Sequence, residues 1–324
     1  MHTTRRRGLR ALAAIAALSC GLAAAQGFPT KPITLVVPNP PGGLVDGSAR
    51  LLSEPLGRVL GQSVVVDNKG GASGNVAYAQ VARAPADGYT LLTSYSAYHV
   101  GNPSLFPKMP WAQKDLAPVA LITAATNVIA VHPSVPANNL QEFIAYLKKN
   151  PGRLSYASQG NGSLSHVGTE MFKAQTGTSM VHIPYRGSGP AILDVLSGQV
   201  QVFMTTPPSV MGHVQNGKLK GIAVTSGARH PGLPQVPTTS EAGLKGFELE
   251  AWVAIFAPAG TPPDVVNKLS ASIKQALDMP ETRSRAAAAG IDLRYQPPAQ
   301  LDALVQRETA FWAKTIQAAK ITAE

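Results

Sequence analysis

Residues 36–46 read Val-Val-Pro-Asn-Pro-Pro-Gly-Gly-Leu-Val-Asp, so two glycines join a β-branched run to an apolar pattern with helical spacing. The same kind of joint recurs at residues 155–164 (Ser-Tyr-Ala-Ser-Gln-Gly-Asn-Gly-Ser-Leu) and 182–191 (His-Ile-Pro-Tyr-Arg-Gly-Ser-Gly-Pro-Ala). Glycines let a backbone approach a ligand closely, and the following helix offers unpaired N–H groups and the positive end of its dipole. One such joint is typical of a tight turn, but three in one chain predict an anion site.

Strand-like and helical patterns alternate around these joints. The expected strands are residues 33–37, 64–67, 89–93, 127–131, 154–157, 180–183, 200–204 and 219–225. The expected helices are residues 44–60, 74–83, 140–149, 164–175, 191–196 and 208–215, followed by 262–277, 280–289 and 298–319, which begin at or near prolines. Pro55 predicts a kink or early stop in the first helix. The alternation predicts an α/β fold with parallel sheets, whose carboxyl edges bind ligands.

The chain opens like a secretory signal peptide. Four arginines within residues 5–10 are followed by an apolar run over residues 9–22, and three alanines stand at residues 23–25. We therefore expect export and cleavage after Ala25, since the apolar run is too short for a membrane span. Lipidation of Cys20 is the less favoured alternative, because Ala17 stands where a lipoprotein-type cut wants a larger aliphatic residue.

Charge and composition exclude several classes of protein. The 324 residues carry a formal net charge of +10, and loss of the four leader arginines lowers it to +6. No window clusters Lys and Arg with aromatic residues, which make up 6% of the chain, so nucleic-acid binding is not expected. The single cysteine lies in the leader, and a mature chain without thiols suits an oxidising compartment.

The joints do not match the signatures of phosphate, metal or hydrolase sites. None ends in the Gly-Lys-Ser/Thr of a phosphate loop, and Ser165 stands where a dinucleotide fingerprint needs glycine. The sequence has no His-Glu-x-x-His and no Gly-x-Ser-x-Gly, so we expect no metal, no cofactor and no catalytic residue. Arg186 is the only basic residue within the joints, and so little formal charge suits a carboxylate better than a polyphosphate.

With these residues in view, the chain resembles the Bug receptors, also called the TctC family, which are extracytoplasmic solute-binding proteins of tripartite tricarboxylate transporters. The resemblance begins with residues 38–50 and continues through residues 66–75 (Val-Asp-Asn-Lys-Gly-Gly-Ala-Ser-Gly-Asn) and 86–92 (Ala-Asp-Gly-Tyr-Thr-Leu-Leu). It extends over residues 150–158, 182–187 and 217–220 to residues 256–262 (Phe-Ala-Pro-Ala-Gly-Thr-Pro). These motifs occur in order over essentially the whole mature chain.

The resemblance implies a type II periplasmic-binding-protein fold, in which two α/β lobes joined by crossing strands surround a central cleft. It implies a lobe 1 of residues 26–125 plus 226–324 and a lobe 2 of residues 126–225. The hinges would fall near residues 124–127 and 225–227. The expected partners are a small carboxylated solute and the permease subunits of a tripartite transporter, and the receptor is expected to be a periplasmic monomer.

Carried onto this sequence, the resemblance and the joints together predict ligand-binding residues from both lobes. They are Asn39, Gly42, Gly43, Asp46, Tyr95, Ser96, Ser158, Gly160, Gly162, Ser163, His166, Tyr185, Gly187, Gly189, Pro190, Ala191 and Thr205.

Some of these residues also have structural interpretations. Asp46 lies in a first helical turn, where it serves equally well as a cap. A helix-anchoring hydrogen bond is the favoured role of His166, whereas Tyr185 is the stronger candidate for ligand contact. Trp252, Phe311 and Trp312 are expected in the core, and Arg50 and Lys69 on solvated faces.

Three positions depart from the pattern of the family that the chain resembles. Asn39 stands where an aromatic residue is common, Leu44 where a small residue or proline is common, and residues 205–206 are threonines where an acid often follows the strand. Loss of that acid removes a potential contact to an amino or hydroxyl group, so the ligand of a relative is not to be copied.

The leading hypothesis is an exported, non-enzymatic receptor that captures a small carboxylate, of the dicarboxylate, tricarboxylate, aromatic-acid or acidic amino-acid class, and delivers it to a permease. A second hypothesis is a secreted hydrolase or isomerase that uses Ser163 or Ser188 with His166. A third is a receptor that reports its ligand to a signalling kinase.

Overall fold

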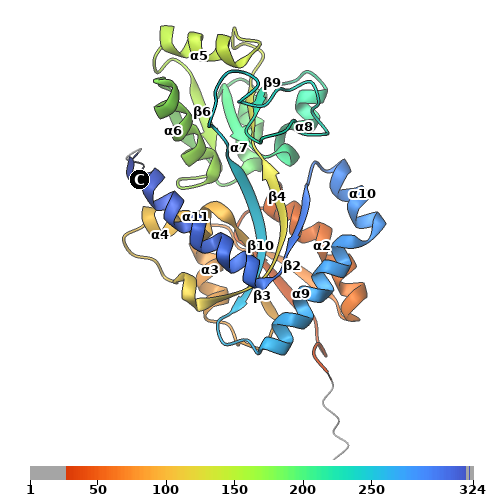
Figure 1. Cartoon of the computed structure of the whole chain (residues 1–324). Helices are drawn as coiled ribbons and strands as arrows, with labels where there is room; N and C mark the ends of the chain where they lie inside the picture. The colour runs from red at the N-terminus through yellow and green to blue at the C-terminus, as the bar shows by residue number, and fades with distance from the viewer. Residues whose placement is uncertain (1–26, 319–320, 322–324) are drawn as a thin grey trace, which may run out of the picture.

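The computed structural model describes residues 27–318 and residue 321, so the expected leader and its cleavage site lie outside the described residues. The chain folds into two α/β lobes with two long strands running between them (Figure 1). This architecture confirms the predicted α/β fold class. None of the described helices combines the length and the apolar character needed to cross a membrane.

Lobe 1 is built on a six-stranded sheet with the strand order β11-β4-β10-β3-β1-β2. Its strands are β1 (Ile33–Val37), β2 (Val64–Asn68), β3 (Thr90–Tyr95), β4 (Leu116–Thr126), β10 (Glu250–Pro258) and β11 (Leu293–Gln296). Its helices are α2 (Leu44–Leu60), α3 (Asn75–Ala82), α4 (Asn102–Leu105), α9 (Pro263–Asp278), α10 (Pro280–Ala288) and α11 (Pro298–Ala318), with short turns η1 (Ala72–Gly74), η2 (Ala97–Gly101) and η3 (Gln113–Asp115). β1 pairs in parallel with β2 and β3, whereas β10 is antiparallel to β3 and β4.

Lobe 2 is built on a five-stranded sheet with the strand order β7-β6-β8-β5-β9. Its strands are β5 (Val128–Val131), β6 (Ser155–Ser158), β7 (Val181–Pro184), β8 (Val202–Thr205) and β9 (Lys220–Val224). Its helices are α5 (Leu140–Lys149), α6 (Leu164–Thr176), α7 (Ser188–Leu196) and α8 (Pro207–Gln215). β6 pairs in parallel with β7 and β8, so the loops after these strands meet at one edge.

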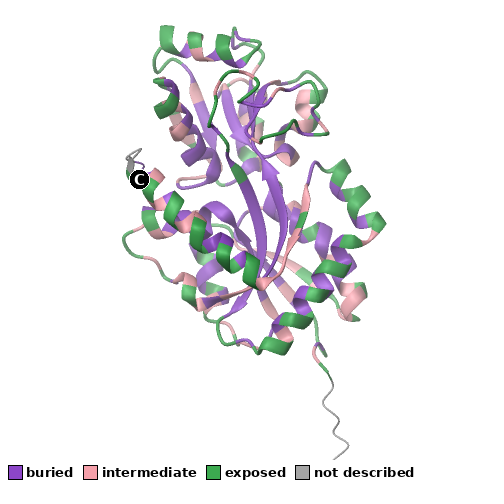
Figure 2. Ribbon diagram, viewed as in Figure 1, coloured by how far each residue is buried: buried purple, intermediate pink, exposed green. Residues whose placement is uncertain are grey.

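Helices cover the sheets because their apolar faces are buried. In α5, Leu140, Phe143 and Leu147 recur at helical spacing and are fully buried, while the Asn139 side chain caps the helix by accepting a hydrogen bond from the Glu142 N–H at 2.9 Å. The central strands are buried on both faces, and the exposed residues gather on the outer helices (Figure 2). This layering leaves the loops at the strand ends to face the space between the lobes.

The chain passes from lobe 1 to lobe 2 at Asn127 and returns between Leu249 and Glu250. Thr225 ties both crossings together, because its hydroxyl accepts from the Asn127 N–H at 2.9 Å and donates to the Leu249 carbonyl at 2.6 Å. The second crossing differs from the expected division, which assigned residues from 226 onward to lobe 1. Residues 228–247 instead pack on lobe 2, where Leu233 and Val236 join the core of the five-stranded sheet.

Two further sequence expectations need correction. Of the two effects predicted for Pro55, a kink or an early stop, the early stop does not occur, because helix α2 continues through Pro55 to Leu60. Phe311 is half exposed on α11, although Trp252 and Trp312 are buried as expected.

Candidate functional site

A cavity of ≈ 690 Å³ lies between the lobes, at the loops that follow strands β1, β2, β6 and β7. Lobe 1 contributes residues 38–41, residues 70–74, Asn68 and Tyr98, and lobe 2 contributes residues 159–160 and 185–187. The carboxyl ends of parallel strands from both lobes therefore face one another across this cavity. This is the edge at which α/β sheets bind ligands.

The structure brings some of the predicted ligand residues to the cavity and places others behind it. The predicted residues that line it are Asn39, Gly160, Tyr185 and Gly187. Those outside the lining are Gly42, Gly43, Asp46, Tyr95, Ser96, Ser158, Gly162, Ser163, His166, Gly189, Pro190, Ala191 and Thr205.

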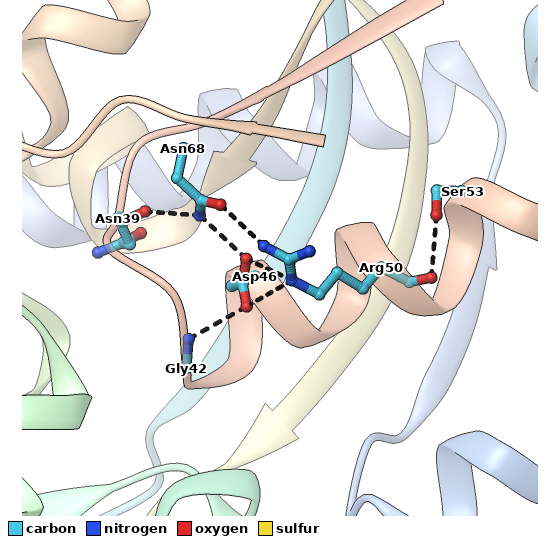
Figure 3. A network of polar contacts seen from close by, with 6 residues as sticks. All are labelled: Asn39, Gly42, Asp46, Arg50, Ser53 and Asn68. Atoms are coloured by element: carbon cyan, nitrogen blue, oxygen red, sulfur yellow. Dashed lines mark hydrogen bonds and ion pairs between the residues drawn. The ribbon is translucent and has the colours of Figure 1, made fainter. Parts of the chain in front are cut away.

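Asp46 holds the first glycine joint in place (Figure 3). Its carboxylate accepts hydrogen bonds from the Gly42 N–H at 3.1 Å, from Arg50 Nε at 3.0 Å and from Asn68 Nδ2 at 2.9 Å. Asn68 Nδ2 also donates to the Asn39 carbonyl at 2.9 Å. Burial raises the pKa of Asp46, but the hydrogen bonds from Arg50, Asn68 and Gly42 outweigh it and hold the pKa below its usual value. Asp46 is thus an ionised positioning residue for residues 39–43.

Gly43 lies at a close contact between lobe 1 and lobe 2. It precedes α2 with a φ of 99°, and a Cβ atom there would lie 2.8 Å from Ser188 Oγ at the start of α7. Gly187 precedes α7 with a φ of 109°, so two helix N-termini converge from opposite lobes. Their dipoles favour negative charge between them.

The second joint is organised by two stacked histidines. The rings of His166 and His182 lie 4.1 Å apart with an interplanar angle of 6°. His166 Nδ1 accepts the Gly162 N–H at 3.1 Å, while His182 Nε2 lies 2.6 Å from Ser158 Oγ. Burial lowers the pKa of both histidines, that of His182 to about 4. Both rings are therefore neutral near pH 7, as the acceptor role of His166 requires.

Ser158 and Ser163 also serve the loop that connects β6 to α6. Ser158 Oγ accepts from the Gly160 N–H and donates to the Gly160 carbonyl, both at 3.2 Å. Ser163 caps α6 by accepting from the His166 N–H at 3.3 Å. These contacts fix the backbone of residues 158–163, whose Gly160 reaches the cavity.

Gln159 is a cleft residue that was not predicted from the sequence. Its Nε2 donates to Ser188 Oγ at 2.6 Å and to Thr205 Oγ1 at 3.2 Å, and its Oε1 accepts from the Tyr95 hydroxyl at 3.4 Å. Tyr95 belongs to lobe 1, so this amide bridges the two lobes. Tyr95 and Thr205 consequently lie behind Gln159 and do not face the cavity.

The third joint lines the cavity with Tyr185, Arg186 and Gly187. The Tyr185 hydroxyl donates to Asp194 Oδ2 at 2.7 Å, and burial together with Asp194 raises the pKa of Tyr185 to about 12. Because the hydroxyl is bonded to Asp194, Tyr185 contributes mainly its ring to the lining of the cavity. The next residues of the joint are turned elsewhere: Pro190 is exposed and Ala191 lies in the core of lobe 2.

Ser96 has a structural role in lobe 1. It is fully buried, and its hydroxyl accepts the backbone N–H of Trp252 at 3.1 Å. Its neighbour Tyr98 lines the cavity and receives a hydrogen bond from Asn39 Nδ2 at 3.2 Å.

The loop between β2 and α3, which was quoted for the family resemblance, is the largest part of the site that was not predicted to bind the ligand. Residues 70–74 line the cavity, and Ser73 Oγ donates to the Asn161 carbonyl in lobe 2 at 2.6 Å. Ala72 and Ser73 have φ values of 47° and 51°, which are unusual for residues other than glycine and mark a strained turn. Residues 66–75 contain the same strand-to-glycine-to-helix order as the three selected joints, and that order was the available signal.

The groups that a hydrolase would need are not assembled in the described part of the chain. His166 Nδ1 accepts the Gly162 N–H, and Ser163 Oγ accepts the His166 backbone N–H as the cap of α6. Ser188 Oγ accepts a hydrogen bond from Gln159 Nε2. Among the described residues, neither the Ser163 nor the Ser188 hydroxyl is hydrogen-bonded to the imidazole ring of His166. The arrangement suits ligand capture better than nucleophilic attack.

Comparisons with known sequences agree with this architecture. The model of the "Tripartite tricarboxylate transporter family receptor" family matches residues 48–321. Protein BugT of Bordetella pertussis is 36% identical over 322 residues, which cover 98% of each chain. A protein encoded in the tcbD-tcbE intergenic region of Pseudomonas sp. strain P51 is 37% identical over 291 residues, covering 89% of this chain and 86% of that one.

Solved structures are similar over nearly the full length. An R. palustris protein determined with adipate has a TM-score of 0.88 and 33% identity, covering 91% of this chain and 99% of that one. The periplasmic binding protein BugD has a TM-score of 0.86 and 35% identity with the same coverage. MatC from Rhodopseudomonas palustris, with bound malate, has a TM-score of 0.84 and 33% identity, covering 89% and 100%.

Proposed function

The chain belongs to the tripartite tricarboxylate transporter receptor family and is a solute-binding receptor, and from this premise we propose that it captures an organic acid in the cleft between its lobes. The observation that carries the proposal is the ≈ 690 Å³ cavity, lined by strand-end loops of both lobes and including Arg186. Relatives of similar structure were determined with adipate and with malate, which are both carboxylates.

The electrostatics of the site support an anion. The N-termini of α2 and α7 converge beside the cavity, and helix N-termini attract negative charge. Asp46, the acid of the first joint, has its charge balanced by Arg50 and also accepts two N–H hydrogen bonds. A carboxylate in the cleft therefore meets positive potential from both lobes.

The predicted partners and location follow from the family. We propose that the receptor is periplasmic, that residues 1–25 are removed after Ala25, and that the loaded monomer delivers its ligand to the permease subunits of a tripartite transporter. We also propose that it releases the ligand unchanged, because Ser163, Ser188 and His166 are engaged in the loop contacts described above.

A thermal melt with a panel of carboxylates tests this function. A ligand that binds the folded state raises the melting temperature, by an amount that corresponds to about 2.7 kcal/mol at one hundred times its Kd. We expect at least one dicarboxylate, tricarboxylate or aromatic acid to do so, and mass spectrometry before and after incubation to recover it unchanged. A panel without any shift would refute carboxylate capture, and turnover of a bound acid would refute the receptor role.

A further inference from the structure

The charged groups around the cavity limit what the ligand can carry. Among the described residues that line the cavity, Arg186 is the one charged side chain, and its guanidinium makes no hydrogen bond or ion pair with the described chain. The two carboxylates bonded to lining residues do not themselves line the cavity: Asp46 pairs with Arg50, and Asp194 accepts the Tyr185 hydroxyl. An ammonium group in the cavity would therefore have no counter-ion, and an unpaired charge out of water is costly.

The polar side chains that line the cavity are bonded to other parts of the protein. Asn68 donates to the Asn39 carbonyl and to Asp46, and its Oδ1 accepts from Arg50 at 3.0 Å. Both polar atoms of the Gln159 amide are hydrogen-bonded: Oε1 to Tyr95, and Nε2 to Ser188 and Thr205.

The remaining hydroxyls of the lining are similarly engaged. Ser73 donates to the Asn161 carbonyl, Tyr185 donates to Asp194, and the Tyr98 hydroxyl accepts from Asn39. Burial raises the pKa of Tyr98 to about 12, so this phenol stays neutral. The exception is Asn39 Oδ1, a buried oxygen without a partner among the described residues, so the side chains of the lining hold one unused acceptor.

The other side chains of the lining are apolar, and the backbone of several glycines completes it. Pro38, Pro40 and Pro41 form one wall, and the rings of Tyr98 and Tyr185 form others. Cavities of about 300–1,000 Å³ accommodate ligands of drug size, and a volume of ≈ 690 Å³ falls within this range. The site thus offers apolar surface for more than a four-carbon acid.

From these observations we propose that the ligand is an organic acid with an apolar body, aliphatic or aromatic, that carries no ammonium group and at most one hydroxyl. A carboxylate of this ligand pairs with Arg186 at the rim of the cleft. The inference rests on the proposed capture of a carboxylate and names the subclass of carboxylate that this cleft accepts.

Matched pairs of probes test each part of the inference by isothermal titration calorimetry at pH 7.5, on purified protein freed of co-purified ligand. Glutarate and glutamate differ by one ammonium group, and we expect glutarate to bind at least about tenfold tighter. Adipate has two more CH₂ groups than succinate, and we expect it to bind about tenfold tighter. Tartrate adds two hydroxyls to succinate, and we expect it to bind more weakly than succinate.

The Arg186 contact is tested by Arg186→Gln, with Arg153→Gln as the matched control. Both changes remove one positive charge from an exposed position beside β6 or β7. Arg153 lies just before the start of β6, whereas the cleft lies at the other end of that strand. We expect Arg186→Gln to weaken adipate binding by about tenfold or more and Arg153→Gln to leave it unchanged.

The outcomes separate this inference from the function on which it rests. Glutamate binding as tightly as glutarate, succinate as tightly as adipate, or tartrate as tightly as succinate would overturn the proposed subclass while leaving carboxylate capture intact. Equal effects of the two arginine changes would overturn the Arg186 contact. Absence of binding by all of these probes would overturn this inference, whereas carboxylate capture itself would be refuted only if the tricarboxylates and aromatic acids of the melting panel were silent as well.

Discussion

At the scale of single residues, the adjacent glycines 42 and 43 have different structural roles. Gly42 has a φ of 92° and nothing within 4 Å of the position a Cβ would take, whereas Gly43 has a φ of 99° and faces Ser188 Oγ at 2.8 Å from that position. Both backbones are strained for any other residue, by about 1–3 kcal/mol. Only at Gly43 does a side chain also obstruct the approach of the two lobes.

We therefore expect Gly43→Ala to weaken ligand binding by at least about tenfold relative to Gly42→Ala, since the strain is shared and the obstruction is not. Calorimetric titration of both variants with the same carboxylate measures the difference. Equal affinities of the two alanine variants would show that this contact does not limit closure.

His166 makes the second joint sensitive to acid. Its Nδ1 accepts the Gly162 N–H, and a proton on Nδ1 removes that hydrogen bond. Tyr156, Glu170 and Lys173 surround the stacked pair of His166 and His182, and burial still lowers the pKa of His166 and brings that of His182 to about 4. The unfolded chain binds these protons more readily than the folded chain. The neutral histidines therefore contribute their full stabilisation above pH 6.5, and this contribution is lost as the pH drops toward 4.

The expected outcome is a melting temperature that decreases between pH 6.5 and pH 4, and less steeply in His166→Asn. The asparagine Oδ1 accepts the Gly162 N–H without titrating in this range. His213→Asn, on α8 and outside the stacked pair, serves as the control and should follow the wild type. Identical pH profiles of all three proteins would exclude this role of His166.

The sequence indicated the joints but could not distinguish their individual residues. Glycine spacing predicted residues 39–43, 158–163 and 185–191 as a group, because the conformational freedom of glycine is a local property. Gln159 was missed because its role depends on Tyr95 and Ser188, which lie far away in sequence. Asp46 and His166 were left with two interpretations each, and only the tertiary contacts assign them to loop positioning.

At the scale of secondary-structure elements, the loop between β2 and α3 closes the site from lobe 1. Ser73 adopts a strained positive φ and makes a 2.6 Å hydrogen bond to lobe 2. Such strain persists where the surroundings over-determine it, often at a binding site.

Ser73→Ala should weaken ligand binding by about fivefold, corresponding to the loss of roughly 1 kcal/mol for one hydrogen bond that forms on closure. Ser53→Ala on α2, whose hydroxyl bonds the Arg50 carbonyl within one helix, is the matched control. Dissociation rates from stopped-flow displacement should rise in Ser73→Ala alone, and a rise of the same size in both variants would contradict this assignment.

Helices and short strands were predicted well because their hydrophobic period is visible in the sequence. α2 and α5 have the predicted bounds, since apolar residues recur every three to four positions. β4 and β10 were not predicted, because both are buried on two faces and show no alternation of apolar and polar residues. β4 also contains Pro118 and several alanines, which are depleted in strands.

At the scale of the whole molecule, the lobes meet at Gly43 and Ser188 and are connected at Asn127 and Leu249. A Cβ placed on Gly43 would lie 3.3 Å from Ser188 Cβ, just below the disulfide range of about 3.5–4.5 Å. The single cysteine of the sequence, Cys20, lies in the leader, so introduced thiols would have no competing partner after cleavage.

A Gly43→Cys/Ser188→Cys variant should therefore lock the lobes together when oxidised. We expect small-angle X-ray scattering to give a radius of gyration that does not respond to adipate in the oxidised variant and responds again after reduction. The single variant Gly43→Cys controls for the substitution itself. An oxidised double variant that still changes size with ligand would show that this contact is not part of the closing surface.

The two crossings have a further consequence for how such receptors diversify. Residues 128–249 form one uninterrupted insertion, and its entry and exit are joined directly, since Asn127 Nδ2 donates to the Leu249 carbonyl at 3.1 Å. Neighbouring ends are what allow a segment to be transplanted between proteins without disturbing its host. One contiguous block of codons thus encodes a complete half-site, and a single recombination with a relative would exchange that half while the other half and its connections stay in place.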